Sequence, residues 1–129
     1  TCTRCYAALK AARGKVILIN SVSGLKTSAG IPAYSASKAG LASLTESLAQ
    51  RWAPEGLQVN GIAPGIVPTK LTEKALAQPG RTEANLQRIP LGRLGSTGDI
   101  ANIAAFLASG LSDYVVGQTI VADGGMMLT

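Results

Sequence analysis

The alternation of short apolar runs with longer stretches of helical composition predicts an α/β fold for this chain. Residues 15–20 (KVILIN) form an unbroken apolar run, which is the pattern of a strand covered on both faces in a parallel sheet. Residues 57–63 (LQVNGIA) predict the next strand, which stops at a Pro-Gly pair. Residues 118–122 (QTIVA) predict a last strand before the turn sequence Asp-Gly-Gly.

Three helical segments flank the predicted strands. Residues 1–12 read as the end of a helix, which stops at a basic residue followed by glycine. Residues 34–52 contain no proline and one glycine, so they predict a single long helix, and its first half is rich in small residues. Residues 99–108 predict an amphipathic helix with Thr97 or Asp99 near its cap.

The segment between the second and third predicted strands begins with a long stretch that has no strand signal. Residues 64–97 far exceed the usual connection of about 4–6 residues, and insertions of this length are commonly lids or binding loops. Short helices are expected at residues 70–78 and 81–87. We therefore predict that residues 64–97 form a substrate lid.

Strand and helix alternate along the whole chain, and this order implies a right-handed parallel sheet with helices on both faces. Three strands are few for a doubly wound sheet, and the first strand would expose an unpaired edge. We therefore expect residues 1–129 to be a single partial domain. It is predicted to be the C-terminal half of a Rossmann-like, doubly wound parallel sheet whose N-terminal βαβ half is absent.

Composition and charge narrow the classes of function. Hydrophobic residues make up 47% of the chain and charged residues 15%, which is typical of a globular domain with a packed core. The net charge of +5 suggests nucleic acid as a partner, but the basic residues are dispersed along the sequence. The low aromatic share of 4% also argues against a base-stacking surface. We expect no nucleic-acid partner.

Cys2 and Cys5 form a C-x-x-C pair, but the chain offers little else for a metal or a thioredoxin-like redox site. It contains no histidine and no second cysteine pair, and no strand precedes the motif. No metal site is therefore expected. No apolar stretch reaches the roughly 18–20 residues of a membrane span, and the first ten residues lack the apolar centre of a signal peptide. The sequence predicts a cytoplasmic protein without a membrane partner.

Candidate chemistry gathers where the predicted strands end, because ligands of open α/β sheets bind beyond the carboxyl ends of the strands. Ser21 follows the first strand, and Tyr34 and Lys38 begin the long helix. Lys38 is one helical turn from Tyr34 and therefore on the same face. An ammonium close to a phenol favours the phenolate, which makes such a tyrosine a usable general acid/base. Ser21 could then donate to a carbonyl oxygen that gains negative charge.

These residues carry a family resemblance. Residues 34–39 (YSASKA) and 59–65 (VNGIAPG), with Ser21 before them, resemble the short-chain dehydrogenase/reductase family in order and spacing. The resemblance covers essentially the whole chain and is closest to 3-oxoacyl-carrier-protein reductases and to bacterial sugar or cyclic-alcohol dehydrogenases. It implies an NAD(P)(H)-dependent oxidoreductase that interconverts a carbonyl and an alcohol by hydride transfer. The catalytic positions it assigns are Ser21, Tyr34 and Lys38, with the tyrosine as general acid/base.

The resemblance also implies where a dinucleotide cofactor, NAD or NADP, is held. Residues 64–69 (PGIVPT) match the segment that meets the nicotinamide carboxamide. The cofactor-binding positions that it assigns are Tyr34, Lys38, Pro64, Gly65, Val67 and Thr69. The family's glycine-rich turn, the residue that selects NAD or NADP and a fourth catalytic asparagine do not occur in this chain. The choice of dinucleotide therefore stays open, and the chain alone is expected to bind it weakly.

Two functions remain open at this point. The first is an enzyme that acts on a small-molecule carbonyl or alcohol, with the chain as its catalytic half. Its relatives often form homo-oligomers, so a dimer or tetramer is expected. The second is a truncated, non-catalytic fragment that acts only as a self-associating structural module through its small-residue helix and exposed first strand.

Overall fold

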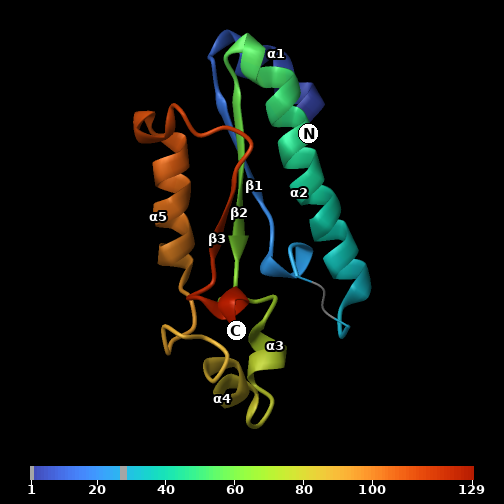
Figure 1. Cartoon of the computed structure of the whole chain (residues 1–129), viewed down its shortest axis with the longest axis vertical. Helices are drawn as coiled ribbons and strands as arrows, with labels where there is room; N and C mark the ends of the chain where they lie inside the picture. Colours follow the sequence, from blue (N-terminus) through green and yellow to red (C-terminus); the bar gives the residue numbers. More distant parts are fainter. Residues whose placement is uncertain (1, 27–28) are drawn as a thin grey trace.

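A parallel sheet of three strands forms the centre of the molecule. The computed structural model describes residues 2–26 and 29–129, with side chains from Arg4 onward. The strands follow one another across the sheet in chain order, as Figure 1 shows. They are β1 (Lys15–Ile19), β2 (Gln58–Pro64) and β3 (Thr119–Ala122). The predicted α/β fold with a parallel sheet is confirmed.

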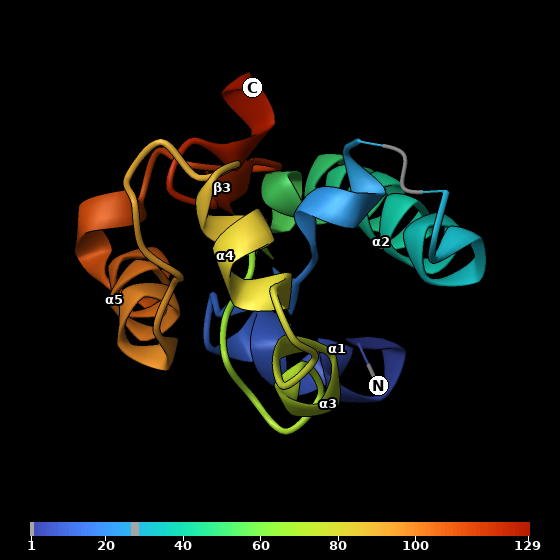
Figure 2. The same ribbon diagram turned by 90° about the horizontal axis from the view of Figure 1, so that it is seen from below.

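Helices cover both faces of this sheet, as the sequence predicts. The predicted right-handedness does not hold for both connections, because strands in chain order with helices on opposite faces require one crossover of each hand. Helix α2 (Pro32–Trp52) lies along one face and α5 (Thr97–Ala108) along the opposite face, and the two views in Figures 1 and 2 show the sheet between them. Helix α1 (Cys2–Ala11) packs on the same side as α2, where Tyr6 and Leu9 contact the core.

The main core lies between α2 and the sheet, toward the amino ends of the strands. Ala49, Trp52, Leu57 and Val59 are nearly inaccessible to solvent, and the rings of Tyr6 and Trp52 lie 5.3 Å apart between centroids. Because residues two apart in a strand share a face, the remaining odd-numbered positions of β2 also face α2.

Polar side chains hold the same end of the molecule together. The Glu55 carboxylate accepts a hydrogen bond from the Tyr6 hydroxyl and forms an ion pair of 2.5 Å with Lys10. On the other side of the sheet, the Lys15 ammonium lies 2.7 Å from an oxygen of Asp113, and the Gln58 amide donates to the carbonyl oxygens of residues 112 and 113. The amino end of the sheet is thus pinned by long-range contacts on both faces.

The boundaries of the elements differ from the sequence prediction by a few residues. Helix α2 begins at Pro32 rather than at residue 34, because proline is well suited to the first turn of a helix. The cap of α5 is Ser96, not Thr97 or Asp99. Its hydroxyl accepts from the backbone N–H of Asp99, and that carboxylate accepts in return from the backbone N–H of Ser96.

Strand and loop boundaries shift in the same way. The first strand ends one residue earlier than predicted, the second runs from 58 to 64, and the third begins at 119. After α1 the left-handed residue is Arg13, with φ of 46°, rather than the glycine that follows it. Four single-turn 3-10 helices complete the described fold: η1 (Val22–Gly24), η2 (Ala53–Glu55), η3 (Gly110–Ser112) and η4 (Met126–Leu128).

Residues 64–97 leave the carboxyl end of β2 and contain two short helices below the sheet in Figure 1. These are α3 (Glu73–Leu76) and α4 (Arg81–Leu86), the first of them shorter than residues 70–78. The two ends of this segment meet, because the backbone N–H of Gly95 donates to the Ile66 oxygen at 2.9 Å. A Cβ on Gly95 would lie 3.0 Å from Val67, so only a glycine fits this junction without displacement.

None of the helices in the described part of the chain has both the length and the apolar character that a membrane crossing requires.

Candidate active site

The residues predicted from the sequence lie at the carboxyl end of the sheet. Ser21 follows β1 directly, residues 64–69 follow β2, and Tyr34 lies in the first turn of α2. Figure 2 views the molecule from this end, with α4 in front and α2 to one side. The fold therefore gathers polar groups at the edge where ligands of parallel α/β sheets bind.

Lys38 and Tyr34 share one face of α2. The Lys38 ammonium lies 5.7 Å from the centroid of the Tyr34 ring and donates a hydrogen bond of 2.8 Å to the carbonyl oxygen of Ile19. That carbonyl is the last one of β1, so the strand end fixes the position of the ammonium. The Tyr34 side chain is 37% exposed, and its hydroxyl makes no hydrogen bond within the described residues. It is therefore accessible to a ligand.

Ser21 is held in the loop between β1 and α2. It caps η1 with an extended backbone, and its hydroxyl oxygen accepts from the backbone N–H of Ser23 at 3.2 Å. The following turn packs directly on α2, since a Cβ on Gly24 would lie 2.6 Å from the carbonyl carbon of Lys38. Glycine is required at this close approach, which brings the Ser21 loop against the helix turn that carries Lys38.

The segment predicted to meet the cofactor forms the neighbouring loop. Gly65 lies against Asp123 at the end of β3, where a Cβ would come within 2.7 Å of the Asp123 side chain. Val67 is buried, and its carbonyl oxygen accepts from the Thr72 hydroxyl at 2.7 Å. Thr69 is exposed, and its backbone N–H donates to the same hydroxyl. The loop is thus rigidly attached at its start and exposes Thr69 at the tip.

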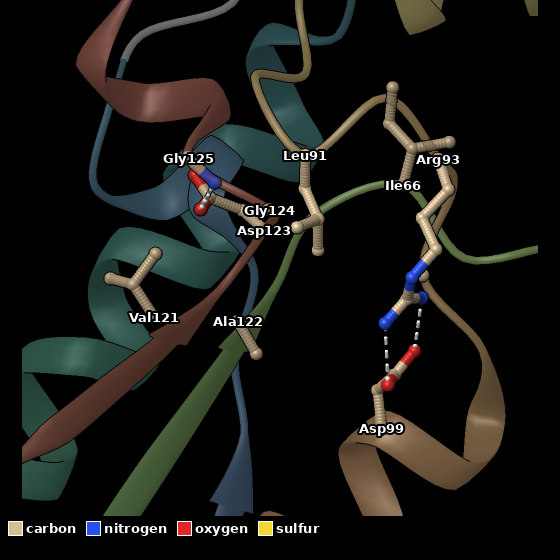
Figure 3. A pocket seen from close by; sticks show the side chains of 10 residues that line it. Ile66, Leu91, Arg93, Asp99, Val121, Ala122, Asp123, Gly124 and Gly125 are labelled. Carbon is tan, nitrogen blue, oxygen red and sulfur yellow. Dashed lines mark hydrogen bonds and ion pairs between the residues drawn. The ribbon is translucent and has the colours of Figure 1, made fainter.

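A surface cavity of about 270 Å³ lies beside this loop, at the ends of β2 and β3. Arg93 and Asp99 form one wall through two hydrogen bonds of 2.8 and 3.0 Å, drawn as dashed lines in Figure 3. The Arg93 guanidinium and the hydrogen bonds from Ser96 hold the pKa of the Asp99 carboxyl well below its usual range. The ion pair neutralises both charges, so this wall supports the fold of the segment rather than a charged ligand.

Sequence reasoning missed Asn20, which precedes Ser21. Its side chain is 3% exposed, and neither its amide nitrogen nor its oxygen has a hydrogen-bond partner within the described residues. The signal was present in the sequence, because an asparagine that ends an apolar strand is a buried polar group near a predicted site. Of the cysteine pair, Cys5 is a free, exposed thiol, and the Cys2 side chain lies outside the described residues.

Comparison with known proteins identifies the family. The family model described as Enoyl-(Acyl carrier protein) reductase matches residues 1–127. Together with the relatives below, this match shows that the chain belongs to the short-chain dehydrogenase/reductase family.

Two groups of relatives are similar in sequence. The chain is 45% identical over 119 residues to the 2-dehydro-3-deoxy-D-gluconate 5-dehydrogenase of Bacillus subtilis. This match covers 92% of the chain and 47% of that protein. It is 41% identical over 120 residues to the 3-oxoacyl-[acyl-carrier-protein] reductase FabG of Thermotoga maritima, covering 93% of the chain and 48% of that protein. The chain thus spans about half the length of the curated relatives it matches.

A solved structure supports the same assignment. The gluconate 5-dehydrogenase of Burkholderia cenocepacia in complex with NADP and tartrate superposes with a TM-score of 0.94 at 32% identity. The match covers 99% of this chain and 51% of that one. The described fold therefore corresponds to half of a larger dehydrogenase domain, which confirms the expectation of a partial doubly wound sheet.

Proposed function

We propose that the protein to which this chain belongs is an NAD(P)(H)-dependent oxidoreductase that interconverts a carbonyl and an alcohol. One observation carries the proposal: the Lys38 ammonium is anchored on the last carbonyl of β1 and lies 5.7 Å from the centre of the exposed Tyr34 ring. A cation fixed beside an accessible phenol, at the carboxyl end of parallel strands, is suited to proton transfer on a bound ligand.

The dinucleotide supplies a hydride donor or acceptor when it is bound. In carbonyl reduction, Tyr34 donates its hydroxyl proton to the oxygen of the substrate, and in alcohol oxidation it accepts that proton. Lys38 stabilises the phenolate that remains after donation, and the Ile19 carbonyl keeps the ammonium in place. The Ser21 hydroxyl donates a hydrogen bond to the same substrate oxygen, which supports the negative charge that develops there.

The residues present fit the nicotinamide end of the cofactor. Lys38 and Tyr34 offer an ammonium and a phenol to the ribose. The adjoining loop offers a rigid wall at Val67 and an exposed hydroxyl at Thr69, with Pro64 and Gly65 at its attached base. The described residues contain no glycine-rich turn between a strand and a helix, so the pyrophosphate and adenosine would be held elsewhere in the protein. NADP is present in the Burkholderia cenocepacia structure, and NAD remains the alternative for this protein.

The substrate is proposed to be a small hydroxy or oxo compound, held under residues 64–97 as a lid. The similarity to gluconate-type dehydrogenases and to 3-oxoacyl reductases supports this class, since a sugar acid and an oxoacyl group both present a carbonyl beside further polar atoms. We also propose a homo-oligomer in the cytoplasm. The non-catalytic module is the competing function, and it predicts no response to nucleotide.

Replacing Tyr34 by phenylalanine in the full-length protein tests the catalytic assignment. The substitution removes only the hydroxyl, so turnover with NADPH or NADH should fall by about 100-fold or more, with little change in melting temperature. Tyr114 provides the matched control, because its side chain is fully exposed and Tyr114→Phe should leave turnover unchanged. Undiminished activity of Tyr34→Phe refutes the assignment.

Thermal melts of the full-length protein with each dinucleotide separate the enzyme from the module. A ligand at a hundred times its dissociation constant stabilises a protein by about 2.7 kcal/mol, so the cofactor should raise the melting temperature by several degrees. The nucleotide that gives the larger shift at equal concentration is the preferred one. A flat response to both nucleotides favours the structural module.

A further inference from the structure

A carboxylate outside the predicted site organises the segment that follows the last strand. Asp123 comes directly after β3 and is partly buried. One of its oxygens accepts from the backbone N–H of Gly125 and the other from that of Met127, both at 2.8 Å. The bond to Gly125 is drawn in Figure 3. Because both oxygens bind backbone donors of the following segment, this carboxylate folds residues 124–129 against the carboxyl end of the sheet.

The folded segment contacts the end of the lid proposed above. The carbonyl oxygen of Gly124 accepts from the backbone N–H of Leu91 at 3.0 Å. A Cβ on Gly124 would lie 2.7 Å from the side chain of Ile89, so the two segments pack without a gap. The Thr129 hydroxyl donates to the carbonyl oxygen of Arg88 at 3.3 Å. The exit of the lid is therefore held by the end of the chain.

The same segment reaches two other loops of the candidate site. The Lys26 ammonium, at the end of the loop that carries Ser21, donates to the carbonyl oxygen of Thr129 at 2.9 Å. A Cβ on Gly65, at the base of the predicted cofactor loop, would lie 2.7 Å from the Cβ of Asp123. Figure 1 shows the chain end, marked C, at the carboxyl end of the strands beside these loops. One short segment thus joins three loops that surround the site.

We propose that Asp123 is a positioning residue of the candidate active site. Its carboxylate keeps residues 124–129 folded, and these residues keep the lid exit and the Ser21 loop in place. Without this support the lid is less ordered, and substrate binding must then order it as well. Tyr34 and Lys38 are held by α2 instead, so the chemical step keeps its geometry. The effect on turnover rests on the proposed function, whereas the contacts do not.

Hydrogen–deuterium exchange of full-length Asp123→Asn tests the support directly. The amide of asparagine has one acceptor oxygen, and its NH₂ group would face a backbone donor. Backbone amides of residues 88–92 and 124–128 should therefore exchange about tenfold faster or more, whereas those of β2 should keep their rates. Unchanged exchange at residues 88–92 overturns the proposal. The measurement requires no turnover, so it does not depend on the proposed function.

Steady-state kinetics show whether the support positions the site. With gluconate or a 3-oxoacyl thioester, whichever the parent protein turns over, Asp123→Asn should raise the substrate KM about fivefold or more and change kcat by less than about twofold. Asp113→Asn is the matched control. It removes the same charge at the other end of the sheet, where the Asp113 side chain is 73% exposed, and should change neither constant.

The possible outcomes separate the two proposals. A parent protein that turns over neither compound refutes the proposed function. An active parent whose Asp123→Asn variant keeps the parent KM refutes the positioning role, even if exchange at residues 88–92 is faster, because Asp123 would then serve the fold alone. An equal rise in KM for Asp113→Asn also refutes it.

Lys26→Met provides a milder test that holds even if Asp123→Asn does not fold. Lys26 is exposed, so its replacement removes the bond to Thr129 with little effect on the core. The substrate KM should rise about threefold, and Lys26→Arg should restore it because a guanidinium can donate to the same carbonyl oxygen. A parent-like KM for Lys26→Met overturns the link between the chain end and the Ser21 loop.

Discussion

The two ends of the sheet differ in how their polar groups are used. At the amino end, Glu55 accepts from Tyr6 and Lys10, and Lys15 is bound to the loop after α5. At the carboxyl end, Ser21 is bonded only to its own turn, the Tyr34 hydroxyl has no partner within the described residues, and Lys38 is held by a single carbonyl.

The amino end of the sheet thus contributes mainly to stability, and the carboxyl end carries the candidate active site. Satisfied polar groups and a dense core at one end give the stability that lets the other end keep groups available for a ligand. Sites of function commonly sacrifice local stability in this way. The comparison therefore predicts that substitutions at the amino end change stability, whereas substitutions at the carboxyl end change activity.

The largest effect is expected for Trp52→Ala. The indole is 6% exposed and packs against Tyr6, so its removal leaves a cavity in the core and should lower the free energy of unfolding by about 3–5 kcal/mol. The site lies at the other end of α2, so turnover per folded molecule should stay near that of the parent protein. Urea unfolding and assays at low temperature measure the two quantities. A loss of turnover as large as the loss of stability would contradict the separation of stability at the amino end from activity at the carboxyl end.

Gly24→Ala should have the next largest effect. In contrast to Trp52→Ala, it should reduce activity more than stability. The added Cβ would lie 2.6 Å from the Lys38 backbone, so η1 must move away from α2, at a cost of about 1–3 kcal/mol. Ser21 would move with the turn, and kcat/KM should fall by about tenfold or more.

The matched control for this substitution is Gly30→Ala. A Cβ on Gly30 meets no atom of residues 2–26 or 29–129 within 4 Å, and its φ lies outside the range that strains other residues. Activity and stability should both be retained. Equal behaviour of the two alanine variants would show that the contact of η1 with α2 does not position the site.

The smallest effect concerns pH. Hydrogen bonds from Lys10 and Tyr6 lower the pKa of the Glu55 carboxyl from its ordinary value. A depressed folded-state pKa contributes stability above the unfolded value of about 4.3, and this stability is lost as the pH falls through the folded-state value. The difference in melting temperature between the parent protein and Glu55→Gln should therefore be largest near pH 7 and shrink below about pH 4. A difference that is constant across this range would exclude an ionic contribution from Glu55.

Local signals in the sequence were sufficient for the elements and for part of the site. Apolar runs located the three strands, and the four-residue interval placed Tyr34 and Lys38 on one face of α2. The boundaries shifted where two signals competed. Ser96, Thr97 and Asp99 are all acceptable caps, and only the reciprocal bonds of Ser96 and Asp99 decide between them.

Features that depend on distant residues could not be derived in the same way. The contact of Gly24 with α2 depends on how that helix lies on the sheet, and the amide of Asn20 lies beside Gly61 because β1 pairs with β2. The interval between these strands is filled by a long helix, and a local pattern does not specify how that helix lies on the sheet. The hydrogen bond from Lys38 to the Ile19 carbonyl also depends on how this helix lies on the sheet.

The junction of Gly95 with Ile66 has a consequence for how such proteins diversify. The two ends of residues 64–97 are bonded to each other. Residues between these ends can therefore be inserted, deleted or substituted at little entropic cost, and the sheet and α5 need not move. Under the proposed role of residues 64–97 as a substrate lid, exchange of this one segment would give the same sheet a new substrate preference.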